Sequence, residues 1–392
     1  MANKLCDKRV CDISEKDFWS SFKVGAKAKG TALAEAVAAG RKGDKDKAYN
    51  RLTDHHRASL AEEWAHHQQR ITASAKPDRK AVNALLTNRI PGWHAKVVDF
   101  GRQIDWSCQA WGQSGLCGFH YLGWISPATN HYIHSGDTKT RNWLIRTVNS
   151  YYAHRNDERP WFKLRLHPTY YELGAGGKAR VLMPMYLALI HGGRITTDTA
   201  EAFNKLFLGF ARSLHSLSAS GYRSGNWQIN GCGALFQLGC SFPEYAESTA
   251  WKRRAVSMLE AHVQRDFFAD GGHKERCWSY GTGVARHLCE AYDTAQRFGG
   301  LGKADQRVLR GIRKAYTWFA KSIGPTDHLP AYGDGQLAFA PKLLEQARAY
   351  FPKGTDATLG IDRGRSYLLD SSGYAIMRNG DDRKATYLNM NV

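Results

Sequence analysis

Residues 221–298 hold the stretch that decides the fold, with Gly225-Asn226-Trp227 at one end and Asp270-Gly271-Gly272 towards the other. Between these polar segments, apolar side chains recur at helical spacing: Ala255, Val256, Leu259, Val263 and Phe267. The spacing predicts an amphipathic helix that begins after Pro243 and ends at Asp270-Gly271-Gly272. The polar segments at its two ends are therefore expected to be loops on one rigid scaffold.

Helical spacing continues on both sides of this stretch. Apolar faces recur in residues 143–152, 203–214, 284–295 and 308–323. Residues 181–190 are apolar nearly all round, which predicts a helix buried on every side. Because consecutive helices with short connections stack as antiparallel hairpins, the sequence predicts a mainly α fold.

The pattern changes near the C-terminus. After a helix expected at residues 343–351, residues 366–377 are β-rich and are interrupted by Asp370-Ser371-Ser372-Gly373. Leu388, Met390 and Val392 then alternate with asparagine. Period-two alternation predicts strands. A pair of strands is not independently stable, so this segment is expected to be a fragment or a sharply truncated form of a larger structure.

Residues 1–85 are rich in alanine, lysine and histidine, and their helical signals are interrupted by the charged segment 41–47. We predict a loosely helical arm. Four histidines form two adjacent pairs here: His55, His56, His66 and His67. Glu62 and Glu63 precede the second pair, but no His-Glu-x-x-His motif results. The pattern favours a solvated helix face, and no metal or other cofactor is expected.

Charge is the main global signal. Lysine and arginine outnumber aspartate and glutamate, which gives a formal net charge of +19. This excess implies either an acidic partner or a generally basic surface that serves solubility. Twelve tryptophans and 18 tyrosines favour a carbohydrate among acidic partners, because flat rings stack on sugar faces. We do not expect nucleic acid. No apolar run is long enough to span a membrane. The eight cysteines lack zinc-finger spacing and are expected to be buried free thiols.

Taken together, the motifs resemble the heparinase II/III family of polysaccharide lyases. The resemblance starts from Asn226-Trp227, Phe242-Pro243-Glu244, and Asp270-Gly271-Gly272 followed by Glu275 and Tyr280. Further matches occur in order outside this stretch: Ile104-Asp105-Trp106, His120 with Ser135-Gly136-Asp137, and Leu329-Pro330-Ala331-Tyr332-Gly333-Asp334. The resemblance covers roughly residues 90–392.

The resemblance implies an incomplete (α/α) toroid of helical hairpins with a cleft across one end, followed by an antiparallel β-sandwich domain. We accordingly expect a helical N-terminal arm at 1–85, a catalytic toroid at 86–355 and the first strands of a truncated β-sandwich at 356–392. The N-terminus lacks the apolar centre of a secretory signal. The family resemblance nevertheless suggests a periplasmic or secreted protein, and localisation and oligomeric state stay open.

A lyase that acts on a uronic acid removes the C5 proton beside a carboxylate. It needs a neutraliser for that carboxylate, a base for the proton and an acid for the leaving oxygen. The resemblance implies Asn226 as the neutraliser and Tyr280 as the acid, and in some relatives the tyrosine is also the base. The structural alternatives are a helix N-cap for Asn226 and a buried, hydrogen-bonded ring for Tyr280.

Six further residues are predicted to bind substrate: His120, Arg180, Arg223, Trp227, Glu275 and Arg276. Four of them have a structural alternative, namely a core histidine for His120, an ion pair with Glu172 for Arg180, core packing for Trp227 and a loop cap for Glu275. The family also carries a histidine, often the base, in its β-sandwich, and no segment here matches it. We therefore expect the chain alone to bind its substrate and leave it intact.

Three functions remain open at this point. The first is β-elimination on an acidic, uronate-containing polysaccharide such as a glycosaminoglycan of the heparin or heparan type. The second is glycoside hydrolysis on an α-toroid, which needs two carboxylates that only Asp270, Glu275 and Asp334 could supply. The third is non-catalytic binding of an anionic polymer.

Overall fold

The computed structural model describes residues 8–25, 30–92, 96–156, 169–193, 195–220, 225–332, 335, 337–351 and 361–391. Its contacts divide the chain into two compact units. The first unit comprises residues 1–220 and 237–252, and the second comprises residues 221–236 and 253–392. The predicted division into arm, toroid and sandwich stays a prediction.

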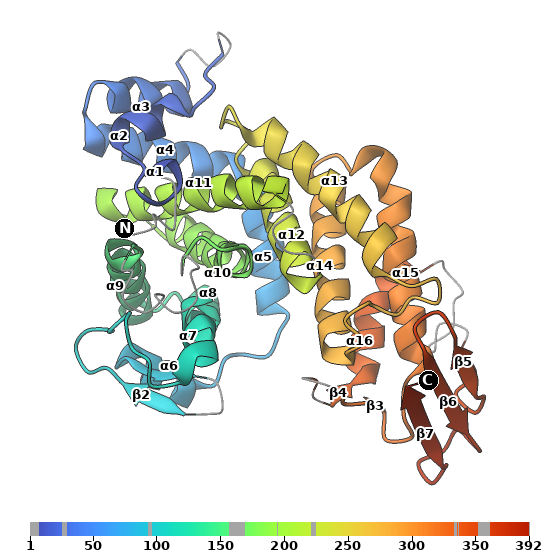
Figure 1. Cartoon of the computed structure of the whole chain (residues 1–392). Coiled ribbons are helices and arrows are strands. Elements are labelled where there is room, and N and C mark those ends of the chain that lie inside the picture. Colours follow the sequence, from blue (N-terminus) through green and yellow to red (C-terminus); the bar gives the residue numbers. More distant parts are fainter. Residues whose placement is uncertain are drawn as a thin grey trace, which may run out of the picture. The chain divides into compact units, whose positions relative to one another are not determined.

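The first unit begins with helices that are more regular than the loose arm predicted from the sequence (Figure 1). They are α1 (Lys8–Cys11), α2 (Glu15–Ser20), α3 (Ala32–Arg41), α4 (Lys45–Ser59), α5 (Ala61–Thr72) and α6 (Arg79–Leu86). Phe18, Trp19 and Tyr49 are almost fully buried and pack as a cluster, with the Trp19 and Tyr49 rings 5.1 Å apart. This aromatic core orders the segment, and the expected break at 41–47 is only the short turn between α3 and α4.

A small hairpin that the periodicity did not predict follows these helices. Strand β1 (Arg89–Pro91) pairs antiparallel with β2 (Val97–Asp99). Next come α7 (Gly112–His120), the 3-10 helix η3 (Gly123–Ile125), α8 (Ser126–Ser135) and α9 (Thr138–His154). Gly136 ends α8 at φ 66°, and the Asp137 carboxylate caps α9 by accepting the Thr140 N–H at 2.7 Å. The Ser135-Gly136-Asp137 motif is therefore a helix-to-helix turn.

Helices α10 (Glu172–His191) and α11 (Thr197–Ser220) form the centre of the first unit. As predicted, the 181–190 part of α10 is almost entirely buried, and its Tyr186 ring lies 5.1 Å from that of Phe203. Helices α12 (Asn226–Ser241) and α13 (Ser248–Asp266) follow, and each contributes residues to both units. The extent of α13 confirms the helix predicted between Pro243 and Asp270.

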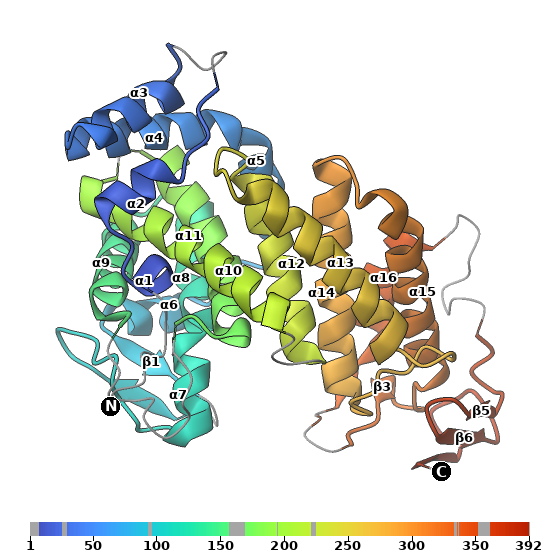
Figure 2. The same cartoon turned by 45° about the horizontal axis from the view of Figure 1, so that its top comes forward.

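In the second unit, α14 (Trp278–Arg297) packs against α15 (Asp305–Lys321) (Figure 2). Their facing apolar residues, including Leu288 and Ile312, are fully buried. The 3-10 helix η5 (Gly302–Ala304) joins these two helices, and α16 (Ala340–Ala347) and η6 (Arg348–Tyr350) follow α15. Strands β3 (His328–Leu329) and β4 (Ala338–Phe339) form a second short antiparallel pair.

The predicted C-terminal strands are confirmed. Strands β5 (Tyr367–Leu369), β6 (Tyr374–Arg378) and β7 (Tyr387–Asn391) form an antiparallel sheet in the order β5-β6-β7. Gly373, at φ 74°, closes the turn between β5 and β6. Leu369, Tyr374 and Ile376 face the core, whereas Leu368 is 69% exposed, so the sheet has one covered face.

Among the described residues, no helix is long and apolar enough to cross a membrane, in agreement with the sequence. The cysteines that the structure describes are all free thiols, as predicted, but Cys11, Cys108 and Cys117 are half-buried and not buried as expected.

Candidate active site at the start of helix α12

Helix α12 begins at Asn226, and two carboxylates from distant segments hold its first residues. The Asn226 N–H donates to Oε1 of Glu275 at 2.7 Å, and the Gly225 N–H donates to Oδ2 of Asp266 at 3.3 Å. The first N–H groups of a helix lack partners within the helix. Carboxylates satisfy them well because the helix dipole makes this end positive. Glu275 and Asp266 therefore cap α12.

Glycine is required immediately before the helix. Gly225 adopts φ 77°, in the left-handed region that other residues avoid. A Cβ atom there would lie 2.3 Å from Oε1 of Glu275. The missing side chain thus permits both the backbone turn and the close approach of the capping carboxylate.

Asp266 is fully buried and is surrounded by cationic groups. Arg265 donates from Nε to Oδ1 at 2.6 Å and from Nη2 to Oδ2 at 2.7 Å, and Nζ of Lys274 lies 2.6 Å from Oδ1. Nδ1 of His262 lies 2.8 Å from Oδ2. Burial alone would raise the pKa of Asp266, but hydrogen bonds from Arg265, His262 and Lys274 hold it far below its usual range. Asp266 is therefore ionised at any physiological pH.

The loop between α13 and α14 is anchored at several points. Phe267 forms a bridge with His273, and Oδ2 of Asp270 accepts hydrogen bonds from the Ser372 N–H and hydroxyl, each at 2.8 Å. Burial lowers the pKa of His273 to about 3, so this ring is neutral. Trp278 is fully buried against Trp318, with ring centroids 4.7 Å apart, and is a core residue. Glu275 is consequently presented by a rigid loop.

The second unit holds most of the predicted site residues. Asn226 is half-buried, and within the described part of the chain its side-chain amide has no hydrogen-bond partner. Because Asn226 is the first helical residue and its N–H is capped by Glu275, it is not the N-cap considered from the sequence. Trp227 is half-buried beside it, and Tyr280 is half-buried in the first turn of α14.

Arg276 is exposed next to the capping glutamate. Its backbone adopts φ 49°, its carbonyl accepts the Tyr374 hydroxyl at 2.8 Å, and its guanidinium lies 5.9 Å from the centre of the Phe268 ring. Glu275, one residue before Arg276 and five before Tyr280, thus connects the loop that precedes α14 to the start of α12 through its hydrogen bond to the Asn226 N–H. Arg223, the remaining predicted residue of this region, lies outside the described residues.

His120 and Arg180 belong to the first unit. His120 is 4% exposed, its Nε2 donates to the Trp106 carbonyl at 2.9 Å, and its ring packs 5.2 Å from that of Phe119. This environment is that of a core histidine, the structural alternative raised by the sequence. Arg180 is half-buried on α10, and its Nη1 donates to the Gly176 carbonyl at 3.2 Å.

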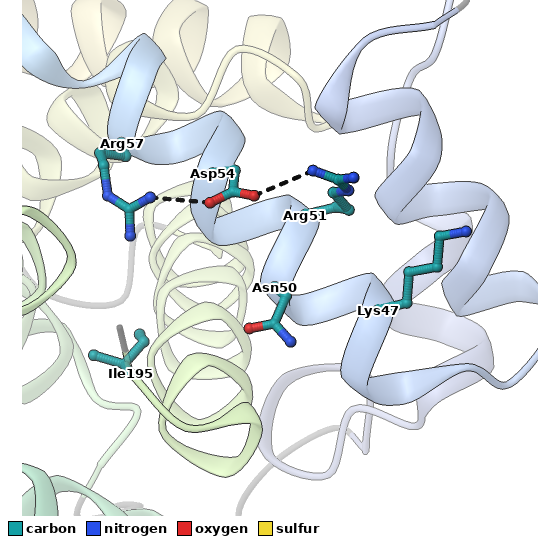
Figure 3. A pocket seen from close by; sticks show the side chains of 6 residues that line it. All are labelled: Lys47, Asn50, Arg51, Asp54, Arg57 and Ile195. Carbon is teal, nitrogen blue, oxygen red and sulfur yellow. Dashed lines mark hydrogen bonds and ion pairs between the residues drawn. The ribbon is translucent and has the colours of Figure 1, made fainter. Parts of the chain in front are cut away.

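A basic pocket also opens on α4 of the first unit (Figure 3). Its volume is about 310 Å³, and it is lined by Lys47, Asn50, Arg51, Asp54, Arg57 and Ile195. Asp54 accepts from Nη1 of Arg57 at 2.9 Å and lies 3.5 Å from Nη1 of Arg51. One carboxylate faces three cations here, so the pocket is a secondary surface that favours anions.

Buried ionisable residues that were not predicted as site residues from the sequence include two with strongly shifted pKa values. One is Asp266, whose only local signal is its position beside Arg265 at the end of an amphipathic helix. The other is Lys178 on α10, which is fully buried, and burial lowers its pKa to about 7. Its Nζ donates to the Thr169 carbonyl at 3.4 Å. Its signal is a lysine that directly follows the small residues 174–177, ahead of the apolar part of the helix.

Comparisons with known proteins assign the chain to a family. Residues 28–358 match the family model described as Heparinase II/III N-terminus. A heparin-sulfate lyase of Pedobacter heparinus is 24% identical over 322 residues, covering 74% of this chain and 45% of that protein. A heparin-sulfate lyase of Bacteroides thetaiotaomicron is 26% identical over 206 residues, covering 46% of this chain and 29% of that protein. The chain thus spans less than half the length of these curated relatives.

Solved structures agree. A crystal structure of heparinase III matches with a TM-score of 0.70 at 16% identity, covering 96% of this chain and 61% of that one. The heparan sulfate lyase HepC from Pedobacter heparinus matches with a TM-score of 0.61 at 17% identity, covering 97% and 61%. These likenesses confirm the predicted fold class, a mainly α toroid followed by antiparallel strands. Because the family model spans most of its length, the chain belongs to the heparinase II/III family.

Proposed function

We propose that this chain carries the helical part of a polysaccharide lyase that cleaves an acidic, uronate-containing glycosaminoglycan by β-elimination. The observation that carries the proposal is the start of α12, where the Asn226 amide has no partner in the described structure although its backbone is firmly capped. Membership of the family, relatives named as heparin-sulfate lyases and a net charge of +19 support it.

In this proposal Asn226 donates its amide N–H to the uronate carboxylate. Neutralising that charge stabilises the carbanion-like state that forms when a base removes the C5 proton. The positive end of α12 acts in the same direction. The C5 electron pair then forms the C4–C5 double bond, the C4–O4 bond breaks, and Tyr280 protonates the leaving oxygen.

The base is either Tyr280 itself or the β-sandwich histidine that the family resemblance implies and that no segment of this sequence matches. A free phenol has a pKa of about 10, so a basic tyrosine needs cations nearby. Lys274 and the exposed Arg276 are the basic residues of the loop that precedes it. We favour the β-sandwich histidine as the base. This chain by itself is then expected to bind the polysaccharide without cleaving it.

The geometry disfavours a glycoside hydrolase. Such an enzyme needs two carboxylates that face the substrate. Oδ1 of Asp270 accepts the Gly272 N–H at 3.0 Å, its Oδ2 binds Ser372, and Glu275 caps Asn226. These carboxylates have structural partners, and Asp334 lies outside the described residues.

The role of Asn226 can be tested without turnover. Binding of heparan sulfate is compared with binding of carboxyl-reduced heparan sulfate for the wild-type chain and for Asn226→Ala. If the amide contacts the uronate carboxylate, carboxyl reduction weakens binding to the wild type, and Asn226→Ala shows a much smaller loss on reduction. Equal losses in both proteins contradict the proposal.

Elimination is tested by the ultraviolet absorbance of the unsaturated uronate product, because hydrolysis and binding create no such chromophore. Any absorbance that develops should be abolished by Tyr280→Phe. The matched control is Tyr292→Phe, which removes the hydroxyl of another half-buried tyrosine on α14. New chain ends without absorbance would favour hydrolysis instead.

A further inference from the structure

Two groups of histidine and carboxylate side chains in the described residues bring three potential metal-ligating atoms within 4.8 Å of one another. One group, His262, Asp266 and His273, lies in the second unit beside the candidate active site. The other, His55, His56 and Glu244, lies in the first unit. The two groups differ in how many hydrogen-bond donors and cations already contact their carboxylate.

The group around Asp266 is a poor metal site. Its carboxylate already accepts two hydrogen bonds from Arg265, and the Lys274 ammonium lies 2.6 Å away. These contacts occupy the lone pairs that a metal would use. Two full positive charges also repel a divalent cation. The role of Asp266 is instead structural, because its carboxylate accepts the Gly225 N–H at the start of α12.

Glu244 is in the opposite situation. Its side chain is 3% exposed, and among the described residues no lysine or arginine pairs with it. Oε1 lies 2.8 Å from Nε2 of His56, but Oε2 has no hydrogen-bond partner in the part of the chain that the structure describes. Nε2 of His55 lies 4.0 Å from Oε2. A buried carboxylate oxygen without a partner is energetically costly, and a bound cation would offset that cost.

The distances suit a small tetrahedral metal ion. Zinc binds histidine nitrogen and carboxylate oxygen at about 2.0 to 2.2 Å, which at the tetrahedral angle separates ligand atoms by about 3.4 Å. The two observed nitrogen-to-oxygen distances, 2.8 and 4.0 Å, lie on either side of that value. Shifts of well under 1 Å would bring both atoms of each pair into the coordination sphere.

The surroundings also resemble those of a metal ligand. The His56 ring is fully buried, and its second nitrogen, Nδ1, lies 2.8 Å from the Tyr186 hydroxyl. Metal-binding histidines are usually oriented through their other nitrogen in this way. His55 is 23% exposed and gives a route from solvent. Two imidazoles and one carboxylate are typical zinc ligands.

We propose that His55, His56 and Glu244 form a zinc site that joins helix α4 to the turn between α12 and α13. The turn is already attached to the N-terminal segment, since the Lys23 N–H donates to the Glu244 carbonyl at 2.8 Å and Phe22 bridges Tyr245. Zinc at this point ties segments 188 residues apart in sequence. The site is independent of the proposed lyase chemistry.

This proposal revises the interpretation of the histidine pairs. From the sequence they were expected to lie on a solvated face, but His56 and His67 are buried at 0% and 7% exposure. His67 is explained locally, because its Nε2 lies 3.2 Å from Oε1 of Glu63 one helical turn earlier. His56 instead faces a carboxylate from a distant segment.

The test uses the chain without a polyhistidine tag, stripped of metal by a chelator. Zinc chloride is titrated calorimetrically, and cobalt(II) chloride is added as a spectroscopic probe of coordination. We expect one zinc per chain, a visible cobalt band typical of tetrahedral coordination, and a rise in melting temperature with zinc. His55→Ala should weaken zinc binding by at least on the order of tenfold, since it removes a direct ligand.

Two further variants keep the test decisive. Glu244→Gln preserves the size of the side chain and its hydrogen-bonding capacity but removes the charge, and it should also weaken zinc binding. His66→Ala removes a half-buried histidine of α5 outside the site and should bind zinc like the wild type. The proposal is overturned if no stoichiometric zinc binds, if His55→Ala binds as tightly as the wild type, or if cobalt shows thiolate charge-transfer absorption from the free cysteines.

Discussion

Replacing Glu275 by alanine tests how the start of α12 is held. The substitution removes the carboxylate that accepts the Asn226 N–H at 2.7 Å. A hydrogen bond to a charged group contributes about 1.5 to 3 kcal/mol, and a carboxylate at a helix N-terminus about 0.3 to 1 kcal/mol. Because Glu275 is half-buried, we expect the variant to lose about 2 kcal/mol in free energy of unfolding.

The loss is measured by urea unfolding and by the melting temperature, which should fall by about 4 to 8 °C. Glu275→Gln keeps an acceptor without the charge and should lose about half as much. Glu345→Ala, on the exposed side of α16, is the control and should stay within about 0.5 kcal/mol of the wild type. If Glu275→Ala is as stable as this control, the cap does not hold α12.

A second measurement connects the cap to the proposed function. A displacement of about 1 Å can cost on the order of a hundredfold in rate, so an uncapped α12 should position Asn226 poorly. Glu275→Ala should then bind heparan sulfate with reduced discrimination against the carboxyl-reduced polymer, even at a temperature where the variant is fully folded. Undiminished discrimination in the folded variant would show that Glu275 contributes to stability alone.

Three further outcomes are expected. Gly225→Ala should lower the free energy of unfolding by at least about 1 to 2 kcal/mol, because alanine disfavours the left-handed backbone. The loss should be larger still because the new Cβ would displace Glu275. The control Gly283→Ala, on α14 with open space around it, should be neutral or stabilising in the same unfolding assay. Lys178→Met should raise the melting temperature more at pH 6 than at pH 9. Burial lowers the folded-state pKa of Lys178 to about 7, so the unfolded chain binds more protons than the folded chain from about pH 7 to 10.5. The destabilisation caused by burying the charged lysine is therefore complete below pH 7 and decreases as the pH rises. A pH-independent effect would contradict the buried charge. Affinity for heparin should fall steeply with added salt, because screening weakens contacts between charges, and salt-independent binding on a heparin column would indicate stacking alone.

Local sequence determined much of this protein. Apolar spacing predicted α13 and the buried part of α10, and period-two alternation predicted the C-terminal strands, because these patterns involve residues that are neighbours along one element. The motifs around Asn226 and Tyr280 were sufficient to indicate the family. By contrast, the N-terminal segment was predicted to be only loosely helical, because the Phe18, Trp19 and Tyr49 cluster that orders it joins different helices.

The tertiary structure alone decided how the functional candidates are held. Glu275 caps Asn226 across 49 residues of sequence, Asp266 reaches Gly225 across 41, and Glu244 meets His56 across 188. Periodicity describes only which side of an element is apolar. It contains no information about which buried polar groups meet, because those pairings are set when distant segments pack together and each buried charge must find a partner.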